Sequence, residues 1–137
     1  MVIVNTLRMK KVVAFIFLLF ASTADAEWMI LGASANGDST LYWENSIIQR
    51  SGDYVKMWKL ANYSSPMPQG NVTYSSYKDF SEYDCKKKKF RYLSASFYSK
   101  NMGKGEVLYR DDKISNWISI QSDTFPKAAL EIACQQK

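Results

Sequence analysis

The sequence predicts an α+β fold in which an antiparallel sheet carries one C-terminal helix on one of its faces. Segments rich in aromatic and β-branched residues follow one another from Trp28 to Arg110 with turn signals between them, as is typical of a strand meander. One amphipathic segment then closes the chain. The only two cysteines, Cys85 and Cys134, are expected to form a disulfide that ties this segment to the sheet.

The first 26 residues have the pattern of a secretory signal peptide. Arg8, Lys10 and Lys11 precede an uninterrupted apolar run at 12–21, and the small-residue sequence Ala24-Asp25-Ala26 follows it. A basic region, an apolar region and a small-residue cleavage site in this order are the three parts of such a signal. The sequence therefore predicts a signal peptide at 1–26 and one domain at 27–137.

The same region predicts that no helix or lipid holds the mature chain in a membrane. Its apolar run has roughly 10 residues, whereas a membrane-spanning helix needs about 20, and no second such run follows. No cysteine at the expected cleavage site is available for lipid attachment, so a soluble exported product is expected whether Met1 or Met9 starts the chain. Losing three basic residues and one acidic residue with the signal lowers the formal charge from +5 to +3. That charge argues against a dedicated nucleic-acid-binding protein.

The first half of the mature domain predicts three strands. Trp28–Ala33 is followed by the turn pair Asn36-Gly37, so a strand at Ser39–Glu44 is expected to pair back on it. A second turn at 51–53 precedes a third strand-like segment, Tyr54–Tyr63. The next seven residues, 64–70, hold two prolines and a glycine and are predicted to form a long loop.

The second half continues the meander. Val72–Phe80 is typical of a strand or an extended segment, and Phe90–Tyr98 gives the clearest strand pattern of the chain. A glycine-rich turn at 101–105 separates it from a strand at Glu106–Arg110. Strict alternation along Phe90–Tyr98 places Phe90 and Tyr92 on one face of the strand. It places the apolar set Leu93, Ala95 and Phe97 on the other face.

The C-terminal segment predicts the helix. Residues 122–124 offer capping side chains, Pro126 fits a first helical turn, and Ala128–Gln135 continues the helix. Its apolar stripe consists of Phe125, Ala129, Ile132 and Ala133. A helix of about three turns is marginal in isolation, so we expect it to dock on the sheet. A disulfide closing a loop of about 50 residues contributes about 4 kcal/mol to stability.

The ordered spacing of residues along nearly all of 27–134 resembles the surface-adhesin protein E family. The resemblance rests on Trp28-x-x-Leu31-Gly32, Tyr42, Ile48-x-Arg50-x-Gly52, Val55-x-x-Trp58, Tyr83-Asp84-Cys85, Arg91-x-Leu93, Tyr98, Met102-Gly103, Trp117 and the helix that carries Cys134. It implies a sheet of about six antiparallel strands whose concave face holds the C-terminal helix through a disulfide.

The resemblance also carries functional expectations. The family takes its name from an outer-membrane adhesin that binds host matrix and serum glycoproteins, so this chain is expected to be a binding module. An adhesin exposed as a lipoprotein needs a lipidated cysteine at its start, and the present sequence has none there. The periplasm is therefore favoured over the cell surface or the medium.

The residue inventory argues against an enzyme. The sequence has no histidine, and both cysteines are expected in the disulfide, so the commonest general base, metal ligand and thiol nucleophile are missing. No cofactor and no metal site are predicted. Five carboxylates remain as acid candidates and are interpreted as solvated turn or strand-edge residues; they are Asp79, Glu82, Asp84, Asp111 and Asp112.

A basic run is the most charged feature of the mature chain, and it is the predicted binding surface: Lys86, Lys87, Lys88, Lys89 and Arg91. It would attract protein partners or acidic glycans. The alternative is a solvated connection or a protected sheet edge. Nearby tyrosines are interpreted mainly as sheet packing, with a contribution to a contact surface as the alternative; these are Tyr74, Tyr77, Tyr83, Tyr92 and Tyr98.

The sequence thus predicts an exported, non-enzymatic binding module of the protein E type that makes protein contacts or mediates adhesion. The first alternative is a soluble periplasmic accessory or structural envelope protein that binds no host molecule. A hydrolase built from the remaining serines and carboxylates is the other alternative.

Overall fold

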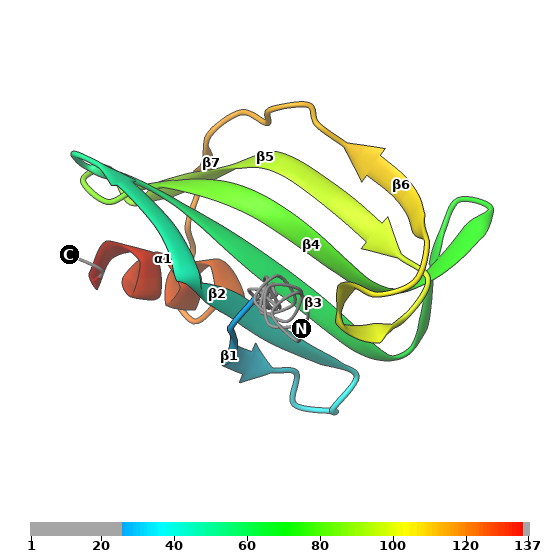
Figure 1. Cartoon of the computed structure of the whole chain (residues 1–137). Helices are drawn as coiled ribbons and strands as arrows, with labels where there is room; N and C mark the ends of the chain where they lie inside the picture. The colour runs from blue at the N-terminus through cyan, green and yellow to red at the C-terminus, as the bar shows by residue number, and fades with distance from the viewer. Residues whose placement is uncertain (1–25, 136–137) are drawn as a thin grey trace, which may run out of the picture.

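The computed structural model describes residues 26–135, so all but the last residue of the predicted signal peptide lies outside it. Within this range the chain forms one antiparallel sheet of seven strands and one helix at its C-terminal end (Figure 1). The elements are β1 Trp28–Ala33, β2 Ser39–Ser51, β3 Tyr54–Gln69, β4 Val72–Asp84, β5 Lys89–Tyr98, β6 Val107–Asp111, β7 Ile118–Ser119 and α1 Phe125–Gln135.

The sheet confirms the predicted meander. Strands β1 to β6 lie side by side in chain order, each antiparallel to the next. The short β7 was not predicted; it pairs with the beginning of β5, where Phe90 lies opposite Ile118. Because β6 pairs with the other end of β5, the connection between β6 and β7 runs along the length of β5.

The predicted proline loop at 64–70 is wrong, because β3 continues through it to Gln69. Pro68 lies opposite Thr73 of β4, beyond a register shift between Asn62 and Met67. Strand β2 pairs with β3 only as far as Tyr63, and the Ser64 N–H donates to the Asp38 carbonyl at 3.0 Å. Beyond Ser64, no strand of the described residues pairs with that edge of β3. Proline lacks a backbone donor, and a free edge needs none.

The predicted faces of β5 are also wrong, because a β-bulge interrupts its alternation. Phe80 of β4 lies opposite Ser94, but the next residue, Ser81, lies opposite Tyr92, which leaves Leu93 as the extra residue. The bulge shifts the pattern by one position. Four residues therefore share one face of the strand: Phe90, Tyr92, Ala95 and Phe97.

Helix α1 packs against one face of the sheet, which we call the helix face (Figure 1). The buried core between them comprises Val55, Met57, Tyr83, Phe90, Ala129, Leu130 and Ala133. As predicted, Thr124 caps the helix: its hydroxyl Oγ1 accepts the Lys127 N–H at 3.4 Å. The predicted disulfide is present and joins Cys134 of α1 to Cys85, directly after β4.

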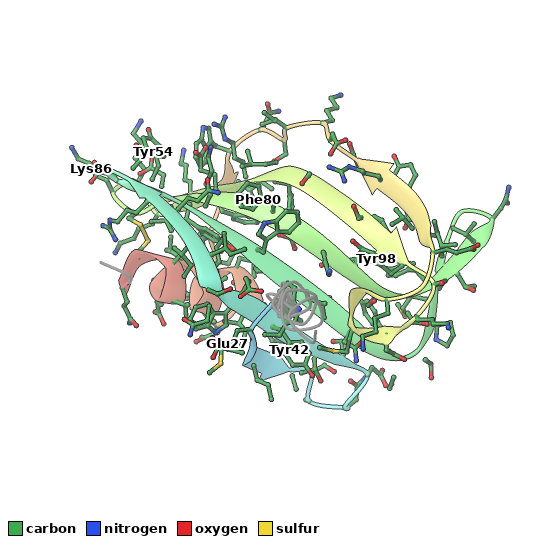
Figure 2. The ribbon with its side chains drawn as sticks, in the orientation of Figure 1. Glu27, Tyr42, Tyr54, Phe80, Lys86 and Tyr98 are labelled. Atoms are coloured by element: carbon green, nitrogen blue, oxygen red, sulfur yellow. A yellow bond between two sulfur atoms is a disulfide. The ribbon has the colours of Figure 1, made fainter. Side chains whose placement is uncertain are left out.

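The opposite face, which we call the outer face, is covered at one end by a turn. The predicted glycine-rich turn contains a short 3-10 helix, Asn101–Gly103, that folds over it. Ser76 Oγ donates to the Lys100 carbonyl at 2.6 Å and accepts the Gly103 N–H at 2.8 Å. Phe80 and Tyr98 lie on this face (Figure 2). None of the helices in 26–135 is long and apolar enough to cross a bilayer.

Candidate binding surfaces

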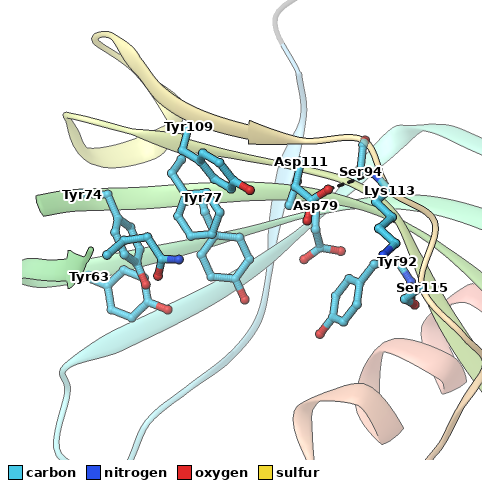
Figure 3. Close-up of a pocket in the computed structure, with 13 residues that line it drawn as sticks. Tyr63, Tyr74, Tyr77, Asp79, Tyr92, Ser94, Tyr109, Asp111, Lys113 and Ser115 are labelled. Carbon is cyan, nitrogen blue, oxygen red and sulfur yellow. Dashed lines mark hydrogen bonds between the residues drawn. The ribbon is translucent and has the colours of Figure 1, made fainter. Parts of the chain in front are cut away.

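Helix α1 leaves part of the helix face uncovered, and a cleft of about 550 Å³ lies there (Figure 3). Its lining comes from β3 to β6 and the segment after β6: Tyr63, Gln69, Tyr74, Tyr77, Asp79, Tyr92, Ser94, Ala95, Phe97, Tyr109, Asp111, Lys113 and Ser115. We call it the tyrosine cleft. Its volume is within the usual range of small-molecule and cofactor sites.

Aromatic rings from four neighbouring strands form one wall of the tyrosine cleft. Tyr77, Phe97 and Tyr109 are successive cross-strand neighbours, with ring centroids 5.5 Å apart between Tyr77 and Phe97 and 5.9 Å between Phe97 and Tyr109. Tyr74 meets Phe97 edge to face at 4.8 Å, and Tyr63 meets Tyr74 in the same way at 5.6 Å. These offset and edge-to-face contacts hold the rings in fixed orientations.

A buried ion pair lies between the tyrosine cleft and the core. Lys59 Nζ lies 3.2 Å from Asp79 Oδ1, and both side chains are less than a tenth exposed. The same Asp79 oxygen accepts the Ser81 hydroxyl at 2.6 Å. The Lys59 ammonium also lies 5.6 Å from the ring centroid of Tyr92 and 5.8 Å from that of Phe90, within the range of cation–π attraction.

Lys59 and three tyrosines of the cleft keep their protons to high pH. Burial is the largest single influence on Lys59 and disfavours its charged form, but the attractions to Asp79, Tyr83, Tyr92 and Tyr77 together outweigh it and raise the pKa of the ammonium above its ordinary value. Burial raises the pKa of Tyr63 to about 12, and burial followed by repulsion from Asp79 raises the pKa of Tyr77. Burial also raises the pKa of Tyr92. The phenol groups of these three tyrosines therefore remain neutral donors at physiological pH.

The other wall of the tyrosine cleft is polar. Asp111 Oδ1 accepts the Lys113 N–H at 2.8 Å, which fixes the chain where it leaves β6. Ser115 is bound to β5, because its Oγ accepts the Tyr92 N–H at 2.9 Å and its own N–H donates to the Tyr92 carbonyl at 3.0 Å. With Lys59 facing Asp79 and Lys113 beside Asp111, the formal charges around the cleft cancel.

The structure divides the predicted basic surface in two. Lys86, Lys87 and Lys88 form the exposed turn between β4 and β5, which we call the lysine tip (Figure 2). Asp84 Oδ1 shapes this turn by accepting the Lys86 N–H at 3.1 Å and the Lys87 N–H at 2.9 Å. Lys88 adopts a positive φ of 55°.

The other two basic residues of that prediction lie in β5, which begins at Lys89. Arg91 donates from Nε to Glu82 Oε1 at 2.8 Å and from Nη2 to the same oxygen at 2.6 Å. Its guanidinium lies 4.4 Å from the ring centroid of Trp117. Arg91 is therefore held on the sheet by its own partners and is not part of the lysine tip.

The interpretation of all five acid candidates as solvated residues is wrong for three of them. Asp79, Glu82 and Asp84 are buried on β4, whereas Asp111 and Asp112 are exposed. Strand β4 lies in the middle of the sheet, so its carboxylates need partners to remain there. Asp79 has Lys59, Glu82 has Arg91 and Asp84 has the backbone of the lysine tip.

The tyrosine cleft as a site was not foreseen from the sequence, although three of the singled-out tyrosines, Tyr74, Tyr77 and Tyr92, line it. Tyr83 is a fully buried core residue and Tyr98 lies on the outer face. A signal was present, because aromatic residues recur in consecutive strands at Tyr77, Phe97 and Tyr109. Aligning them required the bulge at Leu93 and the strand register. Residues 26–135 contain no cluster of three metal-ligating acidic or cysteine side chains.

Comparisons with known proteins identify the family. Residues 28–135 match the family described as surface-adhesin protein E. The selenomethionine form of Haemophilus influenzae protein E is similar in fold, with a TM-score of 0.59 and 17% identity over 80% of this chain and 86% of that one. Its crystal form II gives a TM-score of 0.58 and 17% identity over 77% of this chain and 87% of that one. No protein of curated function was found to match in sequence. Because the family match spans most of its length, the chain belongs to the surface-adhesin protein E family.

Proposed function

We propose that residues 1–26 export the chain and that the mature domain, 27–137, is a non-enzymatic binding module whose main ligand site is the tyrosine cleft. Membership of an adhesin family supports a binding role. The observation that carries the choice of site is the fixed array of rings beside convergent hydroxyl and carboxylate groups. Such a combination of apolar walls and a few placed polar groups is typical of ligand sites.

The chemistry of the tyrosine cleft favours an uncharged, polyhydroxylated ligand. Its formal charges cancel, so neither an anion nor a cation gains a net attraction. The rings of Tyr77, Phe97 and Tyr109 offer apolar surface, and the phenol, serine and aspartate groups around them offer donors and acceptors. A neutral sugar ring of a glycan has the matching pair of surfaces, an apolar C–H face and hydroxyl edges.

The test is binding of the disulfide-bonded mature domain to an array of neutral and acidic glycans, with Tyr109→Ser as the cleft variant. Tyr109 is 50% exposed, so the fold tolerates this change. The matched control is Tyr54→Ser, which removes a tyrosine that is 42% exposed outside the cleft. We expect Tyr109→Ser to weaken binding of a neutral glycan about tenfold and Tyr54→Ser to leave it unchanged. Equal binding by both variants would remove the cleft as the site.

The lysine tip is a second candidate, for an acidic partner such as an acidic protein segment or a sulfated glycan. Its supporting observation is that exposed lysines extend from a turn anchored beside the Cys85–Cys134 disulfide. The double variant Lys86→Ser/Lys87→Ser is the test, because it leaves the positive φ of Lys88 alone. Lys100→Ser/Lys104→Ser removes the same charge from exposed positions elsewhere. Only the first variant is expected to weaken binding and its dependence on salt.

We propose the periplasm as the location, because no cysteine for lipid attachment stands at the predicted cleavage site after Ala26. The family name instead indicates a surface protein. Antibody or protease treatment of intact and permeabilised cells distinguishes the two. If antibody or protease reaches the domain only after permeabilisation, the periplasm is supported. If, in addition, the domain captures no partner from envelope extracts, the accessory-protein alternative is favoured over a binding module.

A further inference from the structure

Glu44 of β2 is a buried carboxylate with no positive partner among the described residues. Glu44 is only 2% exposed. Oε1 accepts three hydrogen bonds, from the Glu27 N–H at 2.9 Å, the Ser46 N–H at 2.9 Å and the Ser46 hydroxyl at 2.6 Å. Oε2 is buried and has no hydrogen-bond partner within 26–135. A buried charge left in this condition is costly.

Glu27 is the residue at which the chain joins the sheet. Its N–H donates to Glu44, and its carbonyl accepts the Asn45 N–H at 3.0 Å. Strand β1 begins at the next residue, Trp28, while Ala26 is exposed and lies outside any element. Glu27 is labelled beside β1 and β2 in Figure 2.

Two independent observations meet at the Glu27 nitrogen. The sequence predicts cleavage after Ala24-Asp25-Ala26, which would make this nitrogen the new amino terminus. The fold places the same nitrogen 2.9 Å from an uncompensated buried carboxylate. We infer that signal-peptide removal completes this site, by turning the Glu27 amide into an α-ammonium group that forms a partly buried ion pair with Glu44.

The chemical step is hydrolysis of the Ala26–Glu27 peptide bond by a signal-peptide-cleaving protease. One water is consumed: its oxygen adds to the Ala26 carbonyl carbon as the C–N bond breaks, so the signal peptide leaves with a carboxylate at Ala26. Both protons of the water go to the Glu27 nitrogen, which becomes an ammonium group. An amide has one N–H and no charge, whereas the ammonium has three N–H donors and a positive charge. It supplies both the donor that Oε2 lacks and the charge that Glu44 needs.

The consequence is that the mature domain is more stable than any form with residues before Glu27. The first experiment compares four proteins: one that begins at Glu27, one with a single glycine added before it, and each of these two with Glu44→Gln. The added glycine moves the ammonium away but keeps the Glu27 N–H. Glu106→Gln, at an exposed glutamate, is the control for the loss of one negative charge.

With Glu44 present, we expect the added glycine to lower the folding equilibrium constant about tenfold, which is the size expected for losing a hydrogen bond to a charged group. With Glu44→Gln, we expect the added glycine to have little effect. In the Glu106→Gln background the glycine should cost the same as in the unmodified protein. An equal effect of the glycine with and without the Glu44 carboxylate, or no effect in either, would overturn the inference.

Two measurements on the unmodified protein need no variant. The intact mass of the exported protein is expected to correspond to a chain that begins at Glu27, and a different first residue contradicts the inference. The α-amine of the folded domain is expected to react with an acylating reagent near neutral pH about tenfold more slowly than the amine of a short Glu-Trp-Met peptide, because an ion-paired ammonium is protonated and held. Equal rates would also contradict it.

Discussion

The two halves of the helix face are built from the same strands but end in different environments. In one half, Val55, Met57 and Tyr83 are fully buried under α1. In the other half, Tyr77 and Phe97 remain partly exposed because no helix or strand of residues 26–135 covers them. The chain has one α-helix of 11 residues in the described range, and the disulfide fixes it over the first half. The part of the sheet face that α1 covers thus becomes core, and the part beyond α1 forms the tyrosine cleft.

The boundary between the halves is the Lys59–Asp79 pair. Both residues point from the sheet toward α1 and the cleft, and Lys59 faces rings of the core and the cleft alike. The core half depends on apolar burial, whereas the cleft half depends on aromatic contacts and polar partners. Changes aimed at one half, at the other or at the boundary are therefore expected to differ in size.

Alkaline pH is expected to have the largest effect, because it acts on the boundary and on both halves. The folded state raises the pKa of Lys59, and burial raises the pKa values of Tyr63 and Tyr83 to about 12 each. The folded chain therefore holds protons that the unfolded chain releases near pH 10, so stability falls as the pH rises above about 10. Urea unfolding from pH 8 to 12 measures this. A free energy of unfolding that stays flat up to pH 12 would contradict it.

Removing the disulfide by Cys85→Ser/Cys134→Ser is expected to lower the free energy of unfolding by about 4 kcal/mol, because the unfolded chain regains the freedom of a 49-residue loop. The loss arises in the core half, where α1 is tethered. Denaturant unfolding of oxidised and variant proteins measures it. A loss below about 1 kcal/mol would indicate that helix packing alone holds the core half.

Asp79→Asn breaks the boundary and is expected to cost about 3 kcal/mol, because it leaves the Lys59 charge buried without its partner. Asp112→Asn is the control, since Arg110 and Asp112 form an ion pair at 3.0 Å in which both side chains are more than half exposed. The control should change stability by less than about 0.5 kcal/mol. Equal losses in the two variants would show that the boundary pair is not specially buried.

Gly32→Ala tests the docking of α1 on β1. A Cβ atom at Gly32 would lie 2.9 Å from Cε1 of the Phe125 ring, which has to move. We expect a loss of about 2 kcal/mol, measured by thermal or urea unfolding. Adding Phe125→Leu should recover part of it, because the shorter side chain leaves room. No recovery would place the cost in β1 and not at the helix.

The smallest effect on stability is expected in the cleft half. Tyr109→Ser removes a ring that is 50% exposed on the edge strand β6, and we expect it to cost no more than about 1 kcal/mol. The same variant is expected to have the large effect on binding described above. A loss as large as that of Asp79→Asn would mean that the cleft half is a structural core and not a site.

Much of the fold was predictable because its signals are local. Asn36-Gly37 marked the first hairpin, and the capping signal at 122–124 located the start of α1. The two cysteines allowed one pairing, which the structure contains. The proline segment of β3 misled the prediction, because proline disfavours a strand that is paired on both edges but is tolerated where one edge has no strand beside it.

The site was less predictable because it depends on pairings between strands. Leu93 gives no local sign that it forms a bulge, yet the bulge moves Phe97 to the same face as Phe90. The carboxylates of β4 likewise resembled surface residues until the sheet placed Lys59 and Arg91 across from them. Cross-strand partners are set by register, which the composition of one strand does not contain.

By itself, the sequence determined the order of β1 to β6, the terminal helix and its tether, because turns and caps act over short distances and two cysteines allow one pairing. The ordered spacing of its residues also indicated the family. Only the tertiary structure decided which residues are core and which line the tyrosine cleft, since both sets are aromatic or apolar positions on one sheet face. Their burial depends on where an 11-residue helix ends. It likewise paired Glu27 with Glu44, 17 residues apart in the chain. The physical reason is that burial belongs to the packed assembly and not to any single segment.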